Sequence, residues 1–94
     1  MTIIITRNAA MHILKHAVST QEIRQAERDP VRVIARSRAA FNIVYARTHA
    51  GRLLVIVIER RPAGQFLITA RDMAPWEKRF YRKKRKTRRE DETD

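Results

Sequence analysis

The sequence predicts an α+β fold in which two short helices precede a run of strands and a third helix follows them. Apolar residues at helical spacing fill residues 7–28, and apolar runs with period-two alternation fill residues 31–70. A proline then opens a strongly basic segment at Pro75. With 94 residues, 44% of them hydrophobic, the chain is long enough for one domain with a core.

The first element is a possible strand at Thr2–Ile5, a short β-branched run. Thr6 can then cap a helix over Arg7–Ala17, because its hydroxyl can accept a hydrogen bond from an amide of the first turn. Apolar residues within that range fall at i, i+3 and i+4 spacing. We therefore expect an amphipathic first helix.

A capping box marks the start of the second helix. Ser19 can accept a bond from the amide of Glu22, and the Glu22 carboxylate can accept one from the amide of Ser19. The helix should extend to about Arg28 and stop before Asp29-Pro30, since proline disfavours helix in the residue before it.

Four strands are expected next, and short turns that contain glycine join the last three of them. The third of them is almost entirely aliphatic, as in a central strand covered on both faces. The turns are His49-Ala50-Gly51 and Arg61-Pro62-Ala63-Gly64. The predicted strands are Val31–Ala35, Asn42–Thr48, Arg52–Glu59 and Gln65–Ala70.

The last helix should start at Pro75, a residue that suits the first helical position. Trp76 and Phe80 lie one turn apart and can pack on the body. Tyr81 is the last apolar residue of the chain, so the helix beyond it has no apolar side chain with which to pack. We therefore expect one domain over residues 1–81 and a charged C-terminal extension over 82–94.

Charge indicates an anionic partner. The net charge is +11: residues 1–77 hold twelve basic and six acidic residues (+6), and residues 78–94 hold nine and four (+5). Such a balance suits nucleic acid, an anionic membrane or an acidic protein. The chain has no cysteine and no apolar run long enough to span a bilayer, so we expect a cytoplasmic protein without disulfides, thiolate metal sites or a membrane anchor.

Lys15-His16 at the end of the first helix is the first candidate site. Histidine suits proton transfer near neutral pH, and lysine can neutralise a phosphate. The alternative is a solvated helix end, where cations are favoured by the helix dipole. His12 and His16 are also four residues apart, but without a third ligand nearby we expect no metal site.

Arg47 and Arg52 flank the predicted hairpin turn and form the second candidate. Arginine pairs bidentately with phosphate oxygens, so two on neighbouring strands could clamp one phosphodiester. The alternative is a pair of edge charges that discourage aggregation.

The third candidate joins Arg71 to Glu77 and Tyr81, which lie one turn apart on the last helix. Ribonuclease chemistry needs a base for the 2′-OH, cations for the phosphorane and an acid for the 5′-oxygen, and these residue types can supply them. The alternative is an exposed pair, Glu77 and Tyr81, that only stabilises the helix.

Nine of the twelve residues from Lys78 to Arg89 are lysine or arginine. Such a run predicts contacts with phosphate groups that carry no sequence information and weaken with salt. The phosphate-binding candidates in it are Lys78, Arg79, Arg82, Lys83, Lys84 and Arg85.

Three motifs, in order, make the chain resemble the BrnT family of type II toxins over roughly residues 7–82. That family combines a Lys-His-Gly-Val element, a Gly-Arg-hydrophobic strand, and Ser-Ala-Arg followed by Glu and Tyr. The chain departs from it with Ala17 in place of glycine, His12 where asparagine is usual, and Ala74 where a capping threonine is common. The matching segments here are Lys15-His16-Ala17-Val18-Ser19, Gly51-Arg52-Leu53-Leu54-Val55, and Thr69-Ala70-Arg71 with Glu77 and Tyr81.

The resemblance implies a RelE-like fold with two N-terminal helices, a four-stranded, mostly antiparallel twisted sheet and a C-terminal helix. It implies a metal-independent endoribonuclease without cofactor that cleaves RNA to arrest growth. It also implies a cognate BrnA-like antitoxin with a ribbon–helix–helix part, through which alone operator DNA is bound. The catalytic candidates are Lys15, His16, Arg71, Glu77 and Tyr81; Arg52 also matches the family, and Arg47 is added from the clamp argument.

Two other functions fit the residues. The chain could be a basic protein that binds nucleic acid without cutting it, which predicts salt-sensitive binding and intact RNA. Its last helix could instead dock an acidic protein partner.

Overall fold

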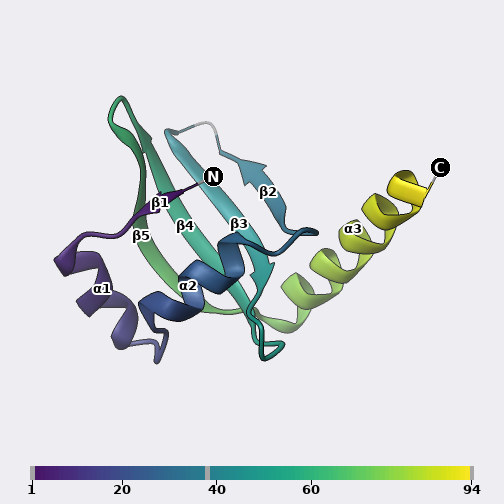
Figure 1. The fold of residues 1–94 in the computed structure, drawn as a ribbon, viewed down its shortest axis with the longest axis horizontal. Helices are drawn as coiled ribbons and strands as arrows, with labels where there is room; N and C mark the ends of the chain where they lie inside the picture. The colour runs from purple at the N-terminus through teal and green to yellow at the C-terminus, as the bar shows by residue number, and fades with distance from the viewer. Residues whose placement is uncertain (1, 38, 94) are drawn as a thin grey trace.

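A computed structural model describes residues 2–37 and 39–93, with side chains described as far as Arg85. Within them the chain forms three helices and one five-stranded sheet of order β1-β5-β4-β3-β2 (Figure 1). The elements are β1 (Ile3–Ile4), α1 (Arg7–Leu14), α2 (Thr20–Glu27), β2 (Val33–Arg36), β3 (Phe41–Arg47), β4 (Leu53–Arg61), β5 (Gly64–Asp72) and α3 (Pro75–Thr93).

The α+β class is confirmed, but the expected number of four strands is wrong. The possible first strand is real: β1 pairs in parallel with the start of β5, which makes the sheet mixed. Its anchor is long-range, since the Ile3 amide donates to Glu27 and the Ile3 carbonyl accepts from Arg24. The two α2 side chains thus hold a two-residue strand that would be marginal alone.

The first helix is capped as predicted but ends earlier. Thr6 Oγ1 accepts from the Ala9 amide at 3.2 Å. The helix stops at Leu14 rather than Ala17, because Ala17 adopts a left-handed conformation with φ 56°. The Val18 amide then donates to the Ile13 carbonyl at 3.1 Å, a closure typical of helix ends that usually carry glycine.

The predicted capping box of the second helix is confirmed. Ser19 Oγ accepts from the Glu22 amide at 3.1 Å, and Glu22 Oε1 accepts from the Ser19 amide at 3.0 Å. The helix ends at Glu27, followed by Arg28 as its cap and Asp29-Pro30 as the break.

Strands β2 to β5 pair antiparallel in chain order, and the two predicted turns join β3 to β4 and β4 to β5. The β4–β5 hairpin is longer than expected, because β4 continues to Arg61 and β5 to Asp72. At the tip of the β3–β4 hairpin the Thr48 amide donates to the Arg52 carbonyl at 2.9 Å, and Gly51 has φ 89°. Glycine suits that position because side chains disfavour it.

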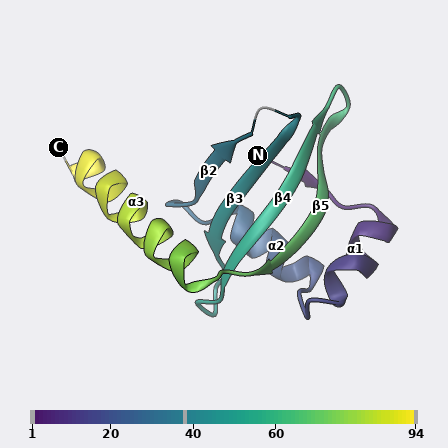
Figure 2. The same cartoon turned by 180° about the vertical axis from the view of Figure 1, so that it is seen from behind.

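The sheet separates two apolar clusters. Helix α1 packs on β5 and α2 on β3, and both lie on one face of the sheet (Figure 1). The main core lies between these helices and the sheet and includes Ile13, Ile23, Val44 and Ile56, all fully buried. Figure 2 shows the opposite face, where the start of α3 lies near the strands and contacts β2 and β3.

The second cluster lies on that opposite face, at the start of α3. Tyr45, Val55, Met73 and Tyr81 are buried there, and Phe80 packs its ring edge against Tyr45 at 5.0 Å between centroids. Pro75 opens α3 as predicted, and one continuous helix crosses the expected boundary at residue 81 and projects from the body (Figures 1 and 2). The side chains of residues 86–94 lie outside the described part.

Candidate nucleic-acid interface

Arg71 and Glu77 form an end-on ion pair at the junction of β5 and α3. Arg71 Nη1 donates to Glu77 Oε1 at 2.6 Å, and Arg71 Nη2 donates to Glu77 Oε2 at 3.0 Å. The carboxylate is 2% exposed, whereas the Arg71 side chain is 48% exposed. A buried acid therefore holds an arginine that faces solvent.

This pairing leaves one edge of the Arg71 guanidinium open. Of its five N–H groups, two bind Glu77 and one donates from Nη1 to the Asp72 carbonyl at 3.0 Å. Among the described residues nothing accepts from Nε or from the second Nη2 hydrogen. Those two N–H groups form the side-on fork that matches two phosphate oxygens.

Glu77 is built into the helix start. Its Oε1 also accepts from the Ala74 amide at 2.8 Å, which is the carboxylate half of a capping box. Ala74 lacks the hydroxyl for the other half, as the sequence indicated. The hydrogen bonds from Arg71 lower the pKa of Glu77, and burial only partly opposes this. Glu77 is thus an ionised positioning residue rather than an accessible proton donor or acceptor.

Tyr81 also serves the structure. It is 1% exposed, and its hydroxyl donates to Asp29 Oδ2 at 2.6 Å. Burial, and then the bond to the carboxylate, raises the pKa of Tyr81 well above that of a free phenol. The phenol ties α3 to the body, and no hydrogen bond among the described residues joins it to Glu77 or Arg71.

Asp29 was not among the predicted site residues, yet it joins the segment after α2 to β3 and to α3. Its Oδ1 accepts from the Val31 amide at 3.0 Å, and its Oδ2 accepts from the Arg47 amide at 3.0 Å as well as from Tyr81. The Asp-Pro break after α2 was the sequence signal, since aspartate often accepts a bond from an amide two residues on. Its partners on β3 and α3 carry no local signal.

The Arg52 guanidinium donates its hydrogen bonds to groups of the protein itself. Its Nε and Nη2 donate to Asp72 at 2.7 and 3.2 Å, and its Nη1 donates to Glu22 at 3.1 Å and to the Ala17 carbonyl at 2.7 Å. It thereby ties the end of α1, the start of α2 and the end of β5 together. These hydrogen bonds raise the pKa of Arg52.

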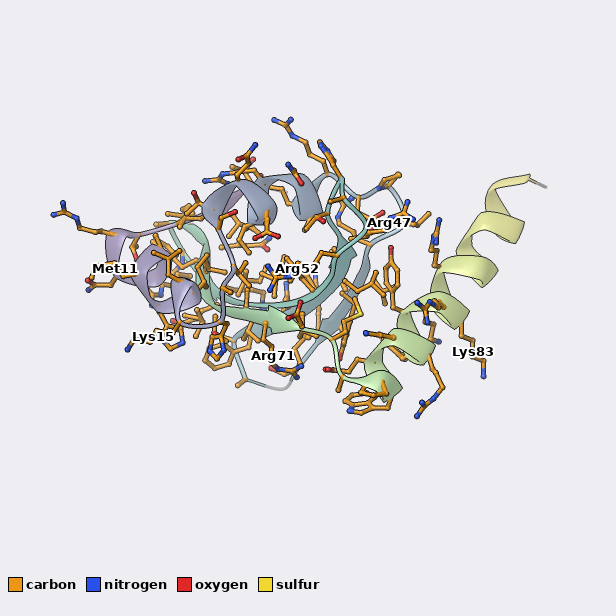
Figure 3. All side chains as sticks on the ribbon, turned by 90° about the horizontal axis from the view of Figure 1, so that it is seen from below. Met11, Lys15, Arg47, Arg52, Arg71 and Lys83 are labelled. Atoms are coloured by element: carbon orange, nitrogen blue, oxygen red, sulfur yellow. The ribbon has the colours of Figure 1, made fainter. Side chains whose placement is uncertain are left out.

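The predicted clamp of Arg47 and Arg52 does not form. Arg47 pairs with Leu53 across the hairpin and so shares its sheet face, whereas Arg52, the next residue, points to the face that carries α1 and α2. Figure 3 shows that Arg52, just before β4, and Arg71, near the end of β5, lie on opposite sides of the ribbon. Arg47 keeps an exposed side chain and remains a phosphate-binding candidate on its own.

Lys15 and His16 are exposed where α1 ends. The His16 carbonyl accepts from Arg52 Nη2 at 3.4 Å, which places the end of α1 beside Asp72. No hydrogen bond or ion pair in the described part joins either side chain to Arg71. The rings of His12 and His16 lie edge to face at 5.7 Å, and no group of three possible metal-ligating carboxylates or histidines occurs among the described residues.

The basic candidates on α3 surround the helix rather than one face. Arg79, Arg82, Lys83 and Lys84 are exposed, while Lys78 and Arg85 are half-buried against the body. Trp76, expected to pack, is instead 56% exposed at the helix start. An exposed indole among cations can stack on an unpaired base, a feature that the sequence alone did not indicate.

Comparison with known proteins adds no identification. No protein-family model matches the chain, and a search of curated proteins finds no significant match. Among the described residues, no helix has the length and apolar character required to cross a membrane.

Proposed function

We propose that the protein is the toxin of a type II toxin–antitoxin system, a metal-independent endoribonuclease of the BrnT kind with a RelE-like fold. The observation that carries the proposal is the fixed Arg71 guanidinium, which is held by Glu77 and exposes a fork of two N–H groups to solvent. A preorganised donor pair of this kind stabilises charge that develops on a phosphorane.

The roles within the proposed site follow from access to solvent. Arg71 contacts the phosphate, and His16, with Lys15 beside it, is the accessible candidate for proton transfer. Glu77 acts as a positioning residue through Arg71, whereas Tyr81 ties α3 to the body through Asp29 and stays outside the chemistry, so we assign neither residue the direct role expected from the sequence.

The Lys-His-Ala-Val element supports the family resemblance. The family has glycine where this chain has Ala17, and Ala17 has the left-handed φ of 56° that glycine adopts without strain. Ala17 therefore occupies a backbone conformation that suits the glycine of the family pattern.

The proposed partner is a cognate antitoxin with a ribbon–helix–helix part. An incompletely covered sheet face beside α3, with half-buried Val33, Ala35 and Ile43, offers it an apolar surface. The net charge of +11 favours an acidic partner segment.

The test is cleavage of a single-stranded RNA by the purified protein in the presence of EDTA, together with RNA integrity after induced expression. Arg71→Ala should lower cleavage by about 100-fold, the usual effect of losing a transition-state donor. Cleavage by the Arg71→Lys variant should fall by a similar factor, since lysine keeps the charge but lacks the fork of two N–H groups. Arg7→Ala, an exposed arginine of α1, is the matched control. Unchanged cleavage in Arg71→Ala would refute the site.

A non-catalytic nucleic-acid-binding protein is the second candidate. It is favoured by the burial of Glu77 and Tyr81, whose side chains are 2% and 1% exposed and already have internal partners. This function predicts that RNA binds with strong salt dependence and stays intact in the same assay.

A further inference from the structure

Two basic hollows flank the tip of the β3–β4 hairpin. The first, of about 540 Å³, lies between the end of α2 and the hairpin and contains Arg28 and Arg47. The second, of about 400 Å³, lies between the hairpin, the end of β5 and α3 and contains Lys78 and Arg82. Gly51 at the tip lines both, so the two hollows are adjacent.

The electrostatics of both hollows favour anions. In the first hollow, Arg28 and Arg47 are exposed, and the one carboxylate, Asp29, is buried and already accepts three hydrogen bonds. In the second, Arg52, Lys78 and Arg82 face one carboxylate, Asp72, whose two oxygens accept from Arg52. Each hollow therefore keeps two cations that no carboxylate lining it binds directly.

Gly51 has no side chain, so no side chain at this position separates the two hollows at the hairpin tip. A side chain built at this position would meet no atom within 4 Å, so the backbone there borders open space. His49 is exposed on the same tip. A chain lying across the hairpin meets backbone at the crossing point and cations on either side of it.

The shape argues for a flexible polyanion rather than a small metabolite. Sites for small molecules are concave and mostly apolar, whereas these hollows are open and lined by charged groups. A path over a hairpin tip also bends sharply. A nucleic-acid duplex resists such bending over a short length, since its persistence length is about 150 base pairs, whereas a single strand does not.

We propose that a single strand of RNA crosses the tip of the β3–β4 hairpin at Gly51, with one phosphate group bound by Arg28 and Arg47 and another by Lys78 and Arg82. We call this path, from Arg28 and Arg47 over Gly51 to Lys78 and Arg82, the track. That the bound strand is RNA rests on the proposed function, while the track itself requires only a chain of phosphodiesters. It gives the polynucleotide a defined path on the body, in addition to the unspecific cations of α3.

The test measures binding of a short fluorescent RNA whose 2′ positions are all methylated, so that it cannot be cleaved through its 2′-hydroxyls. Arg28→Ala with Arg47→Ala, and Lys78→Ala with Arg82→Ala, should each weaken binding by about tenfold, which corresponds to about 1.4 kcal/mol. Each double variant should also reduce the slope of log affinity against log salt by about 0.7 for every phosphate group that the variant no longer binds.

The matched control is Arg7→Ala with Arg36→Ala, which removes the same charge from exposed residues outside both hollows. Equal loss of affinity in the control would overturn the track, as would a duplex that binds as tightly as the single strand. Circular dichroism of each variant checks that it is folded, and only folded variants are compared. The charge reversals Lys78→Glu with Arg82→Glu should weaken binding further if the track is right.

Cleavage assays separate this inference from the proposed function. If the hollow variants lose binding, the control does not, and unmodified RNA stays intact, the track is supported and the nuclease is refuted. If both hollow variants bind and cleave RNA as the wild type does, the nuclease is supported and the track is refuted. Equal affinity for single-stranded DNA would identify the bound group as the phosphodiester itself rather than the ribose.

Discussion

The Glu77 carboxylate fixes the Arg71 guanidinium through both of its terminal nitrogens, at 2.6 and 3.0 Å, and leaves the side-on edge of that guanidinium unpaired among the described residues. The same carboxylate accepts the Ala74 amide and so also starts α3. One buried acid therefore couples the position of the cation to the formation of the helix. Its removal should affect stability and RNA contact together.

We predict that Glu77→Gln lowers the free energy of unfolding by about 1–2 kcal/mol. Hydrogen bonds to charged groups contribute about 1.5–3 kcal/mol, and solvent around the half-exposed Arg71 reduces that value. Chemical denaturation measures the change. Glu59→Gln, which breaks the surface pair of Glu59 with Arg61, should have little effect and serves as the control.

The same variant tests a pH dependence. The pKa of Glu77 is lowered in the folded protein, so its contribution is present above the unfolded value of about 4.5 and is lost as the pH falls through the folded pKa. The difference in stability between wild type and Glu77→Gln should therefore shrink on acidification below about pH 4.5. A difference that stays constant down to strongly acidic pH would contradict an ionised, paired Glu77.

The features that the sequence predicted are local ones. The caps at Thr6 and Ser19, the break at Asp29-Pro30 and the helix start at Pro75 each depend on residues within a few positions of one another. Each depends on hydrogen bonds or backbone preferences within one turn, so pattern and spacing were enough to predict them.

The contacts that decide the site are distant in sequence. Arg52 meets partners 20 and 30 residues away, and Tyr81 meets Asp29 across 52 residues. A sequence pattern shows neither which sheet face a charged residue takes nor whether its partner is a ligand or another side chain. For that reason the motif residues were found, while the internal roles of Arg52, Glu77 and Tyr81 were missed.

Arg52→Lys should destabilise the protein by about 2–3 kcal/mol despite the conserved charge. Lysine has no planar fork, so it cannot bind Asp72 side-on while also donating to Glu22 and to the end of α1. Thermal unfolding followed by circular dichroism measures the loss. Arg7→Lys, at an exposed arginine, should leave the midpoint unchanged; equal midpoints for the two variants would mean that the Arg52 network contributes nothing specific.

Ala17→Gly should stabilise the protein by about 0.5–1 kcal/mol. Ala17 has φ 56°, where the Cβ atom is strained by about 1–2 kcal/mol, and the added freedom of glycine in the unfolded chain offsets part of the gain. Denaturant midpoints measure it. Ala63→Gly, in an exposed turn without positive φ, should not stabilise; a gain there equal to that at Ala17 would show that backbone strain is not the cause.

Alkaline titration tests the tether between Tyr81 and Asp29. The chain has two tyrosines, and the pKa of each is raised in the fold, mainly by burial. A raised pKa on a group that is neutral when protonated contributes stability that is complete below the unfolded value of about 10 and is lost as the pH rises through the folded pKa. Phenolate absorbance should therefore be absent near pH 10 in native protein and present in denatured protein.

Tyr81→Phe removes the hydroxyl that Asp29 Oδ2 accepts, while the Arg47 amide still donates to that oxygen, so the expected loss of stability is about 1–2 kcal/mol. Because the phenol is buried and acts only through Asp29, the folded variant should keep the RNA cleavage of the wild type. Loss of cleavage without loss of stability would instead make Tyr81 the catalytic acid and require the start of α3 to open during the reaction. Cleavage rates and denaturation of the same preparation decide between the two roles, since a tether changes stability and a proton donor changes the pH profile of cleavage.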